Sequence, residues 1–338
     1  MARVTLDGPV PASTSHLIDW IDKAAAPIPL AAIGHRIVHG GDAYRDPQRV
    51  TPAVLATLRD LIPFAPNHLP DEIALIDALA RHRPGVPQVA CFDTAFHADL
   101  PDVARRLPIP ATYDEQGVRR YGFHGLSYAF LLQALERIAG AAAARGRVIL
   151  AHLGNGSSLA AVHAGRSIDT TMAFTPMGGV VMSTRTGDLD PGVVTYLARR
   201  ERWSADQIED LLSHRAGLLG ISGVSGDMRV LLAREGGDPA CRLAVAAYVY
   251  GVKKAIGAMA AALGGLDTLV ISGGIGEHAP LVRARICEGL SFLGVTIDPD
   301  RNHVNAPVVS VPGEGVVVRV IATDEELMIA RAVFHLLS

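Results

Sequence analysis

The sequence predicts an α/β protein with two domains. Short apolar runs at residues 30–34, 87–92 and 269–272 have the length of strands that are buried on both faces. Helical patterns separate them, the longest being an alanine-rich run at residues 239–263, and a further strand-like run lies at residues 3–6. The chain has 338 residues, of which 49% are hydrophobic, so it holds enough apolar material for two cores.

Charge and composition narrow the range of functions. The formal net charge is -3 at pH 7, which gives no net attraction to nucleic acid or to an anionic membrane. Residues 1–10 show no basic start followed by an apolar segment, and Lys253 and Lys254 interrupt the most apolar helical pattern. We therefore expect a cytoplasmic protein with no nucleic-acid or membrane partner. The three cysteines are far apart in apolar segments, which predicts core residues rather than a disulfide or a zinc site.

A short apolar strand at residues 148–150 runs into a glycine-rich segment. Gly154 and Gly156 have no Cβ atoms that would keep a ligand from the backbone, and Asn155, Ser157 and Ser158 add side-chain donors. This composition is typical of a loop that binds phosphate. Asn-Gly between two apolar runs is also the strongest short signal for a β-hairpin. Both interpretations stay open on this segment alone.

Ligand-binding side chains are expected where the buried strands end, because open α/β sheets bind ligands at the carboxyl ends of their strands. Arg36 follows the strand at residues 30–34, and its guanidinium matches a carboxylate or a phosphate; the alternative is a structural ion pair. Asp93 follows the strand at residues 87–92, either as a helix cap or as a group that orients a neighbouring charge. His124 lies between glycines and near arginines, which favours a site over a structural role.

Three later segments also point to anion or metal binding. Arg185 lies in a loop rich in serine, threonine and glycine, either as an anion contact or as a solvated charge. The strand at residues 269–272 runs into a predicted glycine loop at residues 273–278 and a helix after Pro280, the local geometry of nucleotide binding. Neither glycine segment is a P-loop or a full dinucleotide fingerprint. Acids at residues 324–326 begin the last predicted helix, where they either favour its N-terminus or provide a carboxylate for magnesium.

Together, eight segments resemble the acetate kinase (acetokinase) family, which belongs to the superfamily of acetate and sugar kinases, Hsc70 and actin. The resemblance runs in order over nearly the whole chain, from about residue 14 to residue 332. Eight collinear segments are a stronger signal than any single glycine loop. The segments are residues 35–41, 92–97, 119–125, 152–158, 182–191, 217–229, 272–277 and 323–327.

The resemblance implies a two-domain actin-like (ribonuclease H-like) ATPase fold with its active site in a cleft between the domains. Residues 1–97 and 325–338 would form the first domain, and residues 98–324 the second, with the nucleotide-binding and homodimer surfaces. The implied reaction reversibly transfers the γ-phosphoryl group of ATP to acetate, with Mg²⁺ as cofactor, and gives acetyl phosphate and ADP. A propionate or other short-chain acyl kinase and a catalytically defective nucleotide-binding homologue are the alternatives.

The resemblance also assigns site residues by matching motif. Arg36 and Arg185 would hold the carboxylate and the charge on the phosphoryl group, and Asp93 would orient this arginine pair or the reacting groups. His124 would donate to the phosphoryl oxygens with His68 as its supporting partner, and Glu325 matches the magnesium ligand. The acyl substrate would contact Arg36, Val38, His68, Phe123 and Pro176. ATP would contact His152, Gly154, Asn155, Gly156, Asp227, Met228, Arg229, Gly274, Ile275, Gly276, Glu277 and His278.

The sequence departs from the family pattern in three places. It does not contain the Asn-x-Gly-Ser-Ser-Ser-x-Lys phosphate loop with which the family opens, so we expect a first domain that is truncated on its N-terminal side, with an unpaired sheet edge. Asn67 stands where the family has an apolar pocket residue, which would alter the choice of acyl group. His278 replaces an asparagine, and Leu126 and Tyr128 differ from the family after the Phe-His-Gly motif.

Overall fold

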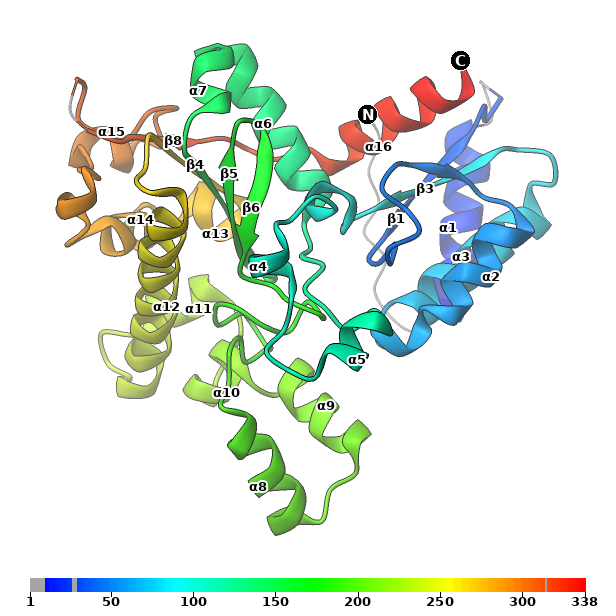
Figure 1. The fold of residues 1–338 in the computed structure, drawn as a ribbon, viewed down its shortest axis with the longest axis horizontal. Coiled ribbons are helices and arrows are strands. Elements are labelled where there is room, and N and C mark those ends of the chain that lie inside the picture. The colour runs from blue at the N-terminus through cyan, green and yellow to red at the C-terminus, as the bar shows by residue number, and fades with distance from the viewer. Residues whose placement is uncertain (1–9, 26–28, 314) are drawn as a thin grey trace. The chain divides into compact units, whose positions relative to one another are not determined.

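The computed structural model describes residues 10–25, 29–313 and 315–338. It divides into two compact units, Met1–Ala98 with Glu325–Ser338, and Asp99–Asp324. Each unit contains a sheet and helices, so the predicted α/β class is confirmed (Figure 1). The strand predicted at residues 3–6 lies outside the described residues.

The first unit contains the strands β1 (Ile33–Ile37), β2 (Gln48–Arg49) and β3 (Gln88–Phe92). β3 lies in the middle, parallel to β1 and antiparallel to β2, and it is buried along its whole length, as its apolar sequence predicts. β1 begins three residues later than predicted, because its pairing with β3 from Ile33 to Ile37 sets its register. Arg36 therefore lies inside the strand, one residue before its carboxyl end, rather than after it.

Helices pack on the sheet of the first unit and on one another. They are α1 (Val10–Ala25), α2 (Pro52–Asp60), α3 (Leu69–His82) and α16 (Glu325–Leu337), with short 3-10 helices at Ile62–Phe64 and Ala95–His97. α3 and α16 both pack against β1. α16 comes so close that a Cβ atom at Gly34 would lie 2.9 Å from Val333 Cγ2. The glycine therefore lets the last helix of the chain reach the first strand, which brings Glu325 to the ends of β1 and β3.

The second unit is built on five strands, namely β4 (Val148–Leu153), β5 (Ser157–His163), β6 (Arg166–Thr170), β7 (Thr268–Ser272) and β8 (Val317–Val320). Their order in the sheet is β6-β5-β4-β7-β8. β4, β5 and β6 form an antiparallel meander, and β7 and β8 join β4 in parallel. The carboxyl ends of β4 and β7 therefore meet at one edge of the sheet.

Helices account for most of the remaining second unit. They are α4 (Asp102–Arg105), α5 (Ala111–Glu115), α6 (Gly125–Ala139), α7 (Ala141–Arg145), α8 (Pro191–Glu201), α9 (Ala205–His214), α10 (Gly217–Ser222), α11 (Met228–Arg234), α12 (Pro239–Leu263), α13 (Gly273–His278), α14 (Pro280–Cys287) and α15 (Pro299–His303), with a 3-10 helix at Ser291–Leu293. α6 and α7 pack on β4, while α12 packs on β4, β5 and β6.

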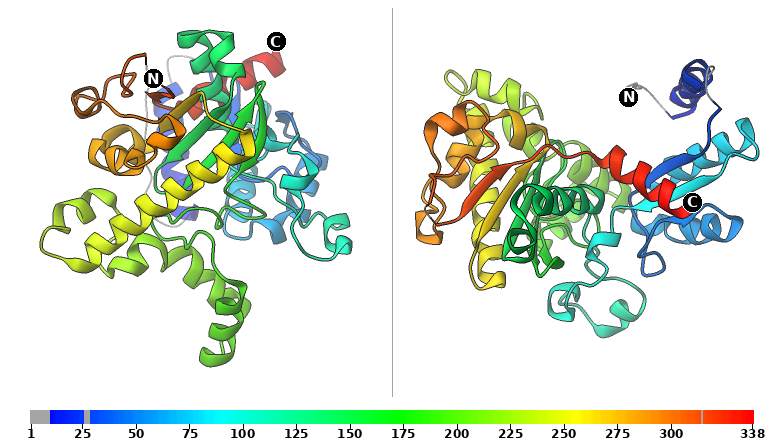
Figure 2. Two further views of the ribbon diagram at one scale, coloured as in Figure 1. Left: turned by 60° about the vertical axis from the view of Figure 1, so that its left-hand side comes forward. Right: turned by 90° about the horizontal axis from the view of Figure 1, so that it is seen from above.

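α12 is the main core helix of the second unit. Asp238 caps its start by accepting from the backbone N–H groups of Ala240 and Cys241. Figure 2 shows this helix (yellow) lying across the green strands, and its Tyr248 and Val252 are fully buried. In the described part of the chain, α12 is the one helix that could cross a membrane by length and composition alone, a test that core helices also pass. The three cysteines are buried and free, which confirms that they are core residues.

The two glycine-rich segments differ in their geometry. Gly154, Asn155 and Gly156 connect the paired strands β4 and β5, so the hairpin describes the backbone of the first segment correctly. The glycine loop predicted at residues 273–278 is wrong, because these residues form α13 directly after β7. Gly273 has φ +78°, and a Cβ atom there would lie 2.6 Å from Leu153 O. Glycine at this position lets the strand turn into the helix without a loop.

Candidate active site

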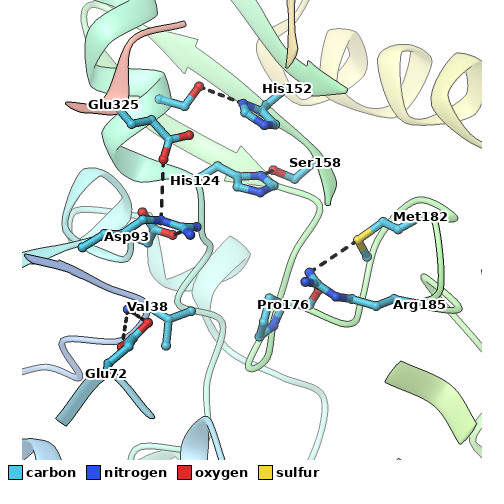
Figure 3. A network of polar contacts seen from close by, with 12 residues as sticks. Val38, Glu72, Asp93, His124, His152, Ser158, Pro176, Met182, Arg185 and Glu325 are labelled. Atoms are coloured by element: carbon cyan, nitrogen blue, oxygen red, sulfur yellow. Dashed lines mark hydrogen bonds and ion pairs between the residues drawn. The ribbon is translucent and has the colours of Figure 1, made fainter. Parts of the chain in front are cut away.

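Charged side chains gather at the carboxyl ends of β1 and β3 in the first unit (Figure 3). Asp93 follows β3 directly, and its backbone N–H donates to Ile37 O at 2.9 Å. The Nη2 of Arg36 donates to Asp93 Oδ2 at 2.5 Å. Because the two strands are parallel, their ends meet at the same edge of the sheet. The predicted Arg36 and Asp93 are therefore neighbours, and they form the ion pair that the sequence left as the structural alternative.

Glu325, the first residue of α16, contacts the same guanidinium, with its Oε2 3.5 Å from Arg36 Nε. Burial raises the pKa of Glu325, and the charge of Arg36 opposes that rise. The nearby carboxylates, Asp93 above all, raise the pKa of Arg36. The Arg36 side chain is still 46% exposed. Two acids thus fix a guanidinium that an anionic ligand can reach.

The carboxylates around Arg36 have the chemistry that a magnesium ion requires. Asp93 Oδ1 is buried without a hydrogen-bond partner in the part of the chain that the structure describes. Mg²⁺ usually takes one or two protein carboxylates and completes its shell with water and phosphate oxygens. Across the described residues, no group of three or more His, Cys, Asp or Glu side chains could hold a metal ion. Asp93 and Glu325 therefore fit an ion held largely by nucleotide and water, and they do not fit a cage made of protein alone.

Glu72 is a site residue that the sequence reasoning missed. It lies in the first turn of α3, and its Oε2 and Oε1 accept from the backbone N–H of Val38 at 3.1 and 3.2 Å. Burial raises the pKa of Glu72 to about 7, although the Val38 N–H and the charge of Arg36 act in the opposite direction. An acid in the first turn of a helix is usually explained by the helix dipole, so the sequence carried no signal. Glu72 fixes the backbone just after the strand that carries Arg36.

We expect Glu72→Gln to change how stability depends on pH. The folded-state pKa of about 7 lies above the ordinary value of 4.5, so between these values the folded protein holds a proton that the unfolded chain has released. The free energy of unfolding of the wild type should therefore fall as the pH rises from 4.5 through 7. The glutamine variant cannot titrate and should lack this loss. Urea unfolding of both proteins at several pH values checks the difference, and parallel curves would contradict it.

The predicted acyl-pocket residues are divided between the two units. Val38 is buried just beyond β1, and His68 precedes the first residue of α3, next to Asn67, in the first unit. Phe123 is buried and Pro176 lies in a loop of the second unit. A common pocket for these side chains, and the predicted support of His124 by His68, stay predictions.

The second unit brings His124, Gly156 and Arg185 together. A Cβ atom at Gly156 would lie 3.2 Å from His124 Nε2 and 3.5 Å from Arg185 Nη1. The Nη1 of Arg185 donates to Pro176 O at 3.2 Å, which holds the guanidinium against this loop (Figure 3). The hairpin tip is anchored to the loop that carries Arg185, because the Ser183 N–H donates to Asn155 O and the Ser183 hydroxyl donates to Asn155 Oδ1, both at 3.2 Å. A histidine, an arginine and a bare stretch of backbone thus face one another, which suits an anion.

His152 belongs to the same group. Its ring stacks on that of His124 with the centroids 4.3 Å apart and the planes 25° apart. The Nδ1 of His152 lies 2.9 Å from Ser127 Oγ, which lies 2.9 Å from Thr323 Oγ1. The predicted ATP contact therefore packs against the predicted phosphoryl donor.

The remaining residues predicted to bind nucleotide lie in or directly before the short helices α11 and α13 of the second unit. Asp227 caps α11, accepting from Arg229 N at 2.8 Å, and the exposed Arg229 side chain donates back to it at 2.6 Å. Met228 is buried beneath them. Glu277 Oε1 accepts from Gly273 N at 2.8 Å, so this carboxylate satisfies the first turn of its own helix. The other predicted residues of α13 are Gly274, Ile275, Gly276 and His278.

Arg283 on α14 is a second residue that the sequence reasoning missed. Its side chain is fully buried, and all of its recorded hydrogen-bond acceptors are neutral. Nη1 donates to the carbonyls of Gly276 and Glu277 at 2.7 and 3.0 Å, near the C-terminal end of α13. Nε and Nη2 donate to Asn302 and Asn305 at distances of 2.6 to 2.8 Å. Arg283 therefore ties α13 to α15. No local sequence pattern predicts this buried role, since an arginine in a helix is usually exposed.

Known proteins resemble this chain over nearly its whole length. The model of the acetokinase family matches residues 13–331. An acetate kinase from Rhodopseudomonas palustris is 50% identical over 335 residues, 97% of this chain and 84% of that protein, and one from Gloeobacter violaceus is 45% identical over 311 residues, 91% and 77% respectively. The crystal structure of Porphyromonas gingivalis acetate kinase has a TM-score of 0.88 and 37% identity, covering 98% of this chain and 85% of that one. A propionate kinase from Francisella tularensis has a TM-score of 0.89 and 36% identity, covering 94% and 82%. The chain therefore belongs to the acetokinase family.

Proposed function

We propose that this chain is an acetate kinase, which transfers the γ-phosphoryl group of ATP to acetate and gives acetyl phosphate and ADP. The observation that carries the proposal is the 50% identity to an acetate kinase over 97% of the chain. The geometry supports it, because Arg36 in the first unit and Arg185 in the second are each arranged to receive an anion. Phosphoryl transfer needs mainly positioning and charge neutralisation, which arginines and a histidine donor supply.

The proposed roles follow from the contacts of each side chain. Arg36 binds the carboxylate of acetate, and Asp93 holds the guanidinium in place through their 2.5 Å hydrogen bond. Arg185 and the hairpin tip at Gly156 receive phosphate oxygens, since neither the guanidinium nor the backbone there carries a negative charge that would repel them. His124 donates a hydrogen bond to the phosphoryl group as its charge develops. Glu72 holds Val38 for the acyl methyl group.

We propose Mg²⁺ as the cofactor, with Glu325 and the unpaired Oδ1 of Asp93 as its protein ligands. Bound there, the ion would neutralise charge on the phosphate oxygens of ATP. Arg36 limits how many ligands the protein supplies, because it already occupies Asp93 Oδ2 and lies 3.5 Å from Glu325 Oε2. The expected ligands of the Mg²⁺ ion are therefore two carboxylates, water molecules and phosphate oxygens of the nucleotide.

Glu325→Gln is expected to raise the Mg²⁺ concentration needed for half-maximal rate about 10- to 100-fold, because a neutral amide binds a hard cation more weakly than a carboxylate. A magnesium titration of kcat at saturating ATP measures it. Glu326→Gln, on the exposed next position of α16, is the matched control. If the wild type and Glu325→Gln needed the same Mg²⁺ concentration for half-maximal rate, Glu325 would not be a ligand of the ion.

The direct test of the function is acyl hydroxamate formation from acetate, ATP and Mg²⁺, repeated with propionate and butyrate. We expect the highest kcat/KM with acetate. The propionate kinase from Francisella tularensis makes a longer acyl group the second candidate, and Asn67 beside His68 is the residue that would alter the preference. ATP binding by calorimetry without turnover on any of the three acids would instead indicate a non-catalytic homologue.

We infer that the protein forms a homodimer. α12 supports this, because its Leu243 and Tyr250 are 61% and 64% exposed on the side that the core does not use. Large exposed apolar residues on one helix favour a protein partner over water. Sedimentation analysis of the wild type and of Leu243→Asp tests it. The cytoplasmic location and the lack of nucleic-acid and membrane partners stay predictions.

A further inference from the structure

Two buried hydroxyl groups, those of Ser158 and Tyr128, hold His124 in the second unit. Figure 3 shows Ser158 beside the His124 ring. Ser158 Oγ lies 2.8 Å from His124 Nδ1, and the Tyr128 hydroxyl lies 2.5 Å from Ser158 Oγ. Tyr128 and Ser158 are fully buried, and His124 nearly so. Tyr128 lies in the first turn of α6 and His124 is the residue just before that helix, and their rings lie edge to face with the centroids 6.4 Å apart. The three groups form a chain from phenol through alcohol to imidazole.

The chemistry of the two hydroxyls gives this chain a direction. A phenol is a stronger acid than an alcohol, which favours the Tyr128 O–H as the donor to Ser158 Oγ and leaves the Ser158 O–H to donate to Nδ1 of His124. Hydrogen bonds that run in one direction strengthen each other. A neutral imidazole whose Nδ1 accepts a hydrogen bond carries its proton on Nε2.

The other ring nitrogen of His124 faces the hairpin tip. Nε2 is the atom that a Cβ at Gly156 would meet at 3.2 Å, with Arg185 Nη1 at 3.5 Å from the same point. The His152 ring covers one face of the imidazole. The His124 backbone has φ +61°, an uncommon conformation for a residue with a side chain. Backbone, ring face and Nδ1 are thus all fixed, and Nε2 is the nitrogen directed at the bare backbone.

We propose that Ser158 and Tyr128 are positioning residues that hold His124 as its Nε2–H tautomer, directed at the hairpin tip. The use of that proton rests on the proposed function, since a phosphoryl oxygen at Gly156 would accept it. Tyr128 is one of the residues at which the sequence departs from the family pattern. Its hydroxyl gives that departure a physical role, because it commits the Ser158 proton to Nδ1.

The neighbouring residue on β5 offers a matched control. Side chains alternate along a strand, so Ser157 faces the opposite side of the sheet from Ser158. Ser157 Oγ lies 2.9 Å from the Tyr248 hydroxyl, and both side chains are fully buried. Tyr128→Phe and Tyr248→Phe therefore delete the same hydroxyl from two buried Ser–Tyr pairs of one unit, only one of which touches the imidazole.

The tautomer can be measured without substrate. ¹⁵N-histidine NMR of the full chain, with the His124 signals assigned from His124→Asn, should show Nε2–H in the wild type and in Tyr248→Phe. Ser158→Ala should give a mixture of tautomers, and Tyr128→Phe should shift part of the population. Identical His124 signals in all four proteins would overturn the proposal, as would an Nδ1–H tautomer in the wild type.

The same variants should separate kcat from KM. We expect Ser158→Ala to lower kcat roughly 10- to 100-fold and Tyr128→Phe roughly 3- to 10-fold, with KM for ATP and acetate changed less than about twofold, since groups that orient another side chain act on its geometry. Tyr248→Phe should keep kcat within about twofold while losing similar stability. A kcat loss in Tyr248→Phe equal to that in Tyr128→Phe would contradict the proposal. An inactive wild type would refute the proposed function and leave the NMR comparison intact.

Discussion

Replacing Arg36 with lysine is expected to lower kcat/KM for acetate about a hundredfold to a thousandfold, the usual effect of removing one preorganised donor from developing charge. Lysine keeps the charge but loses the planar fork that binds Asp93 through Nη2 while Nε faces Glu325. Its ammonium cannot face both acids and also present two N–H groups to a carboxylate. The fall should appear in kcat and in KM for acetate, with a smaller effect on KM for ATP.

Arg59 provides the control for this substitution. It lies in the same unit and donates to Asp77 at 3.1 Å, but both side chains are substantially exposed. Exposed ion pairs contribute little to the free energy of unfolding, so Arg59→Lys should leave the fold intact and kcat/KM within about twofold of the wild type. Steady-state kinetics with varied acetate decide the matter. An Arg36→Lys enzyme with normal KM for acetate would show that the guanidinium does not bind the substrate.

Much of the fold could be predicted from the sequence because strands that are buried in the protein consist largely of apolar residues. β3 and β7 are buried at every position, and each contains an apolar run, residues 89–92 and 269–271. β1 was misplaced by three residues, because its polar His35 and Arg36 are held in the sheet by pairing with β3. That pairing joins residues more than fifty positions apart, so a local sequence pattern cannot predict it.

The glycine segments show a different limit of sequence reasoning. Glycine marks a place where the backbone needs freedom, but it does not say which conformation uses that freedom. Gly154 and Gly156 serve a hairpin, whereas Gly273 serves a direct turn from strand to helix. The first segment still faces a histidine and an arginine, so a hairpin and a proposed phosphate site are compatible.

The residues missed at the site share one property, which is that their partners are remote in the sequence. Glu72 binds the backbone of Val38 across 34 residues, and Arg283 binds Asn302 across 19 residues. Each looks ordinary locally, as a charged residue of a helix. The residues that were predicted, such as Arg36 and Asp93, are charged groups near the carboxyl ends of strands, where open α/β sheets bind ligands. Sequence reasoning therefore finds the groups that meet a ligand more readily than the groups that hold them.

Arg283→Met is expected to cause the largest loss of stability, about 3–5 kcal/mol, because several buried neutral acceptors lose their donor at once and each costs about 1–3 kcal/mol. Methionine fills similar space but donates no hydrogen bond. The carbonyls of Gly276 and Glu277 and the acceptors of Asn302 would lose their donor inside the core. Because the same carbonyls end α13, the KM for ATP should rise as well, which joins the stability of this helix to the proposed nucleotide site.

Arg285, two residues further along α14, tests whether the effect belongs to Arg283 or to any arginine of the helix. It forms a two-point pair with Glu235 at 2.8 and 2.9 Å, with its side chain 35% exposed. Arg285→Met should therefore cost less than about 1 kcal/mol, as partly exposed pairs do. Urea unfolding and the KM for ATP of both variants measure the contrast. Equal losses would mean that the buried guanidinium is replaceable and that α13 is held by its apolar contacts with the sheet.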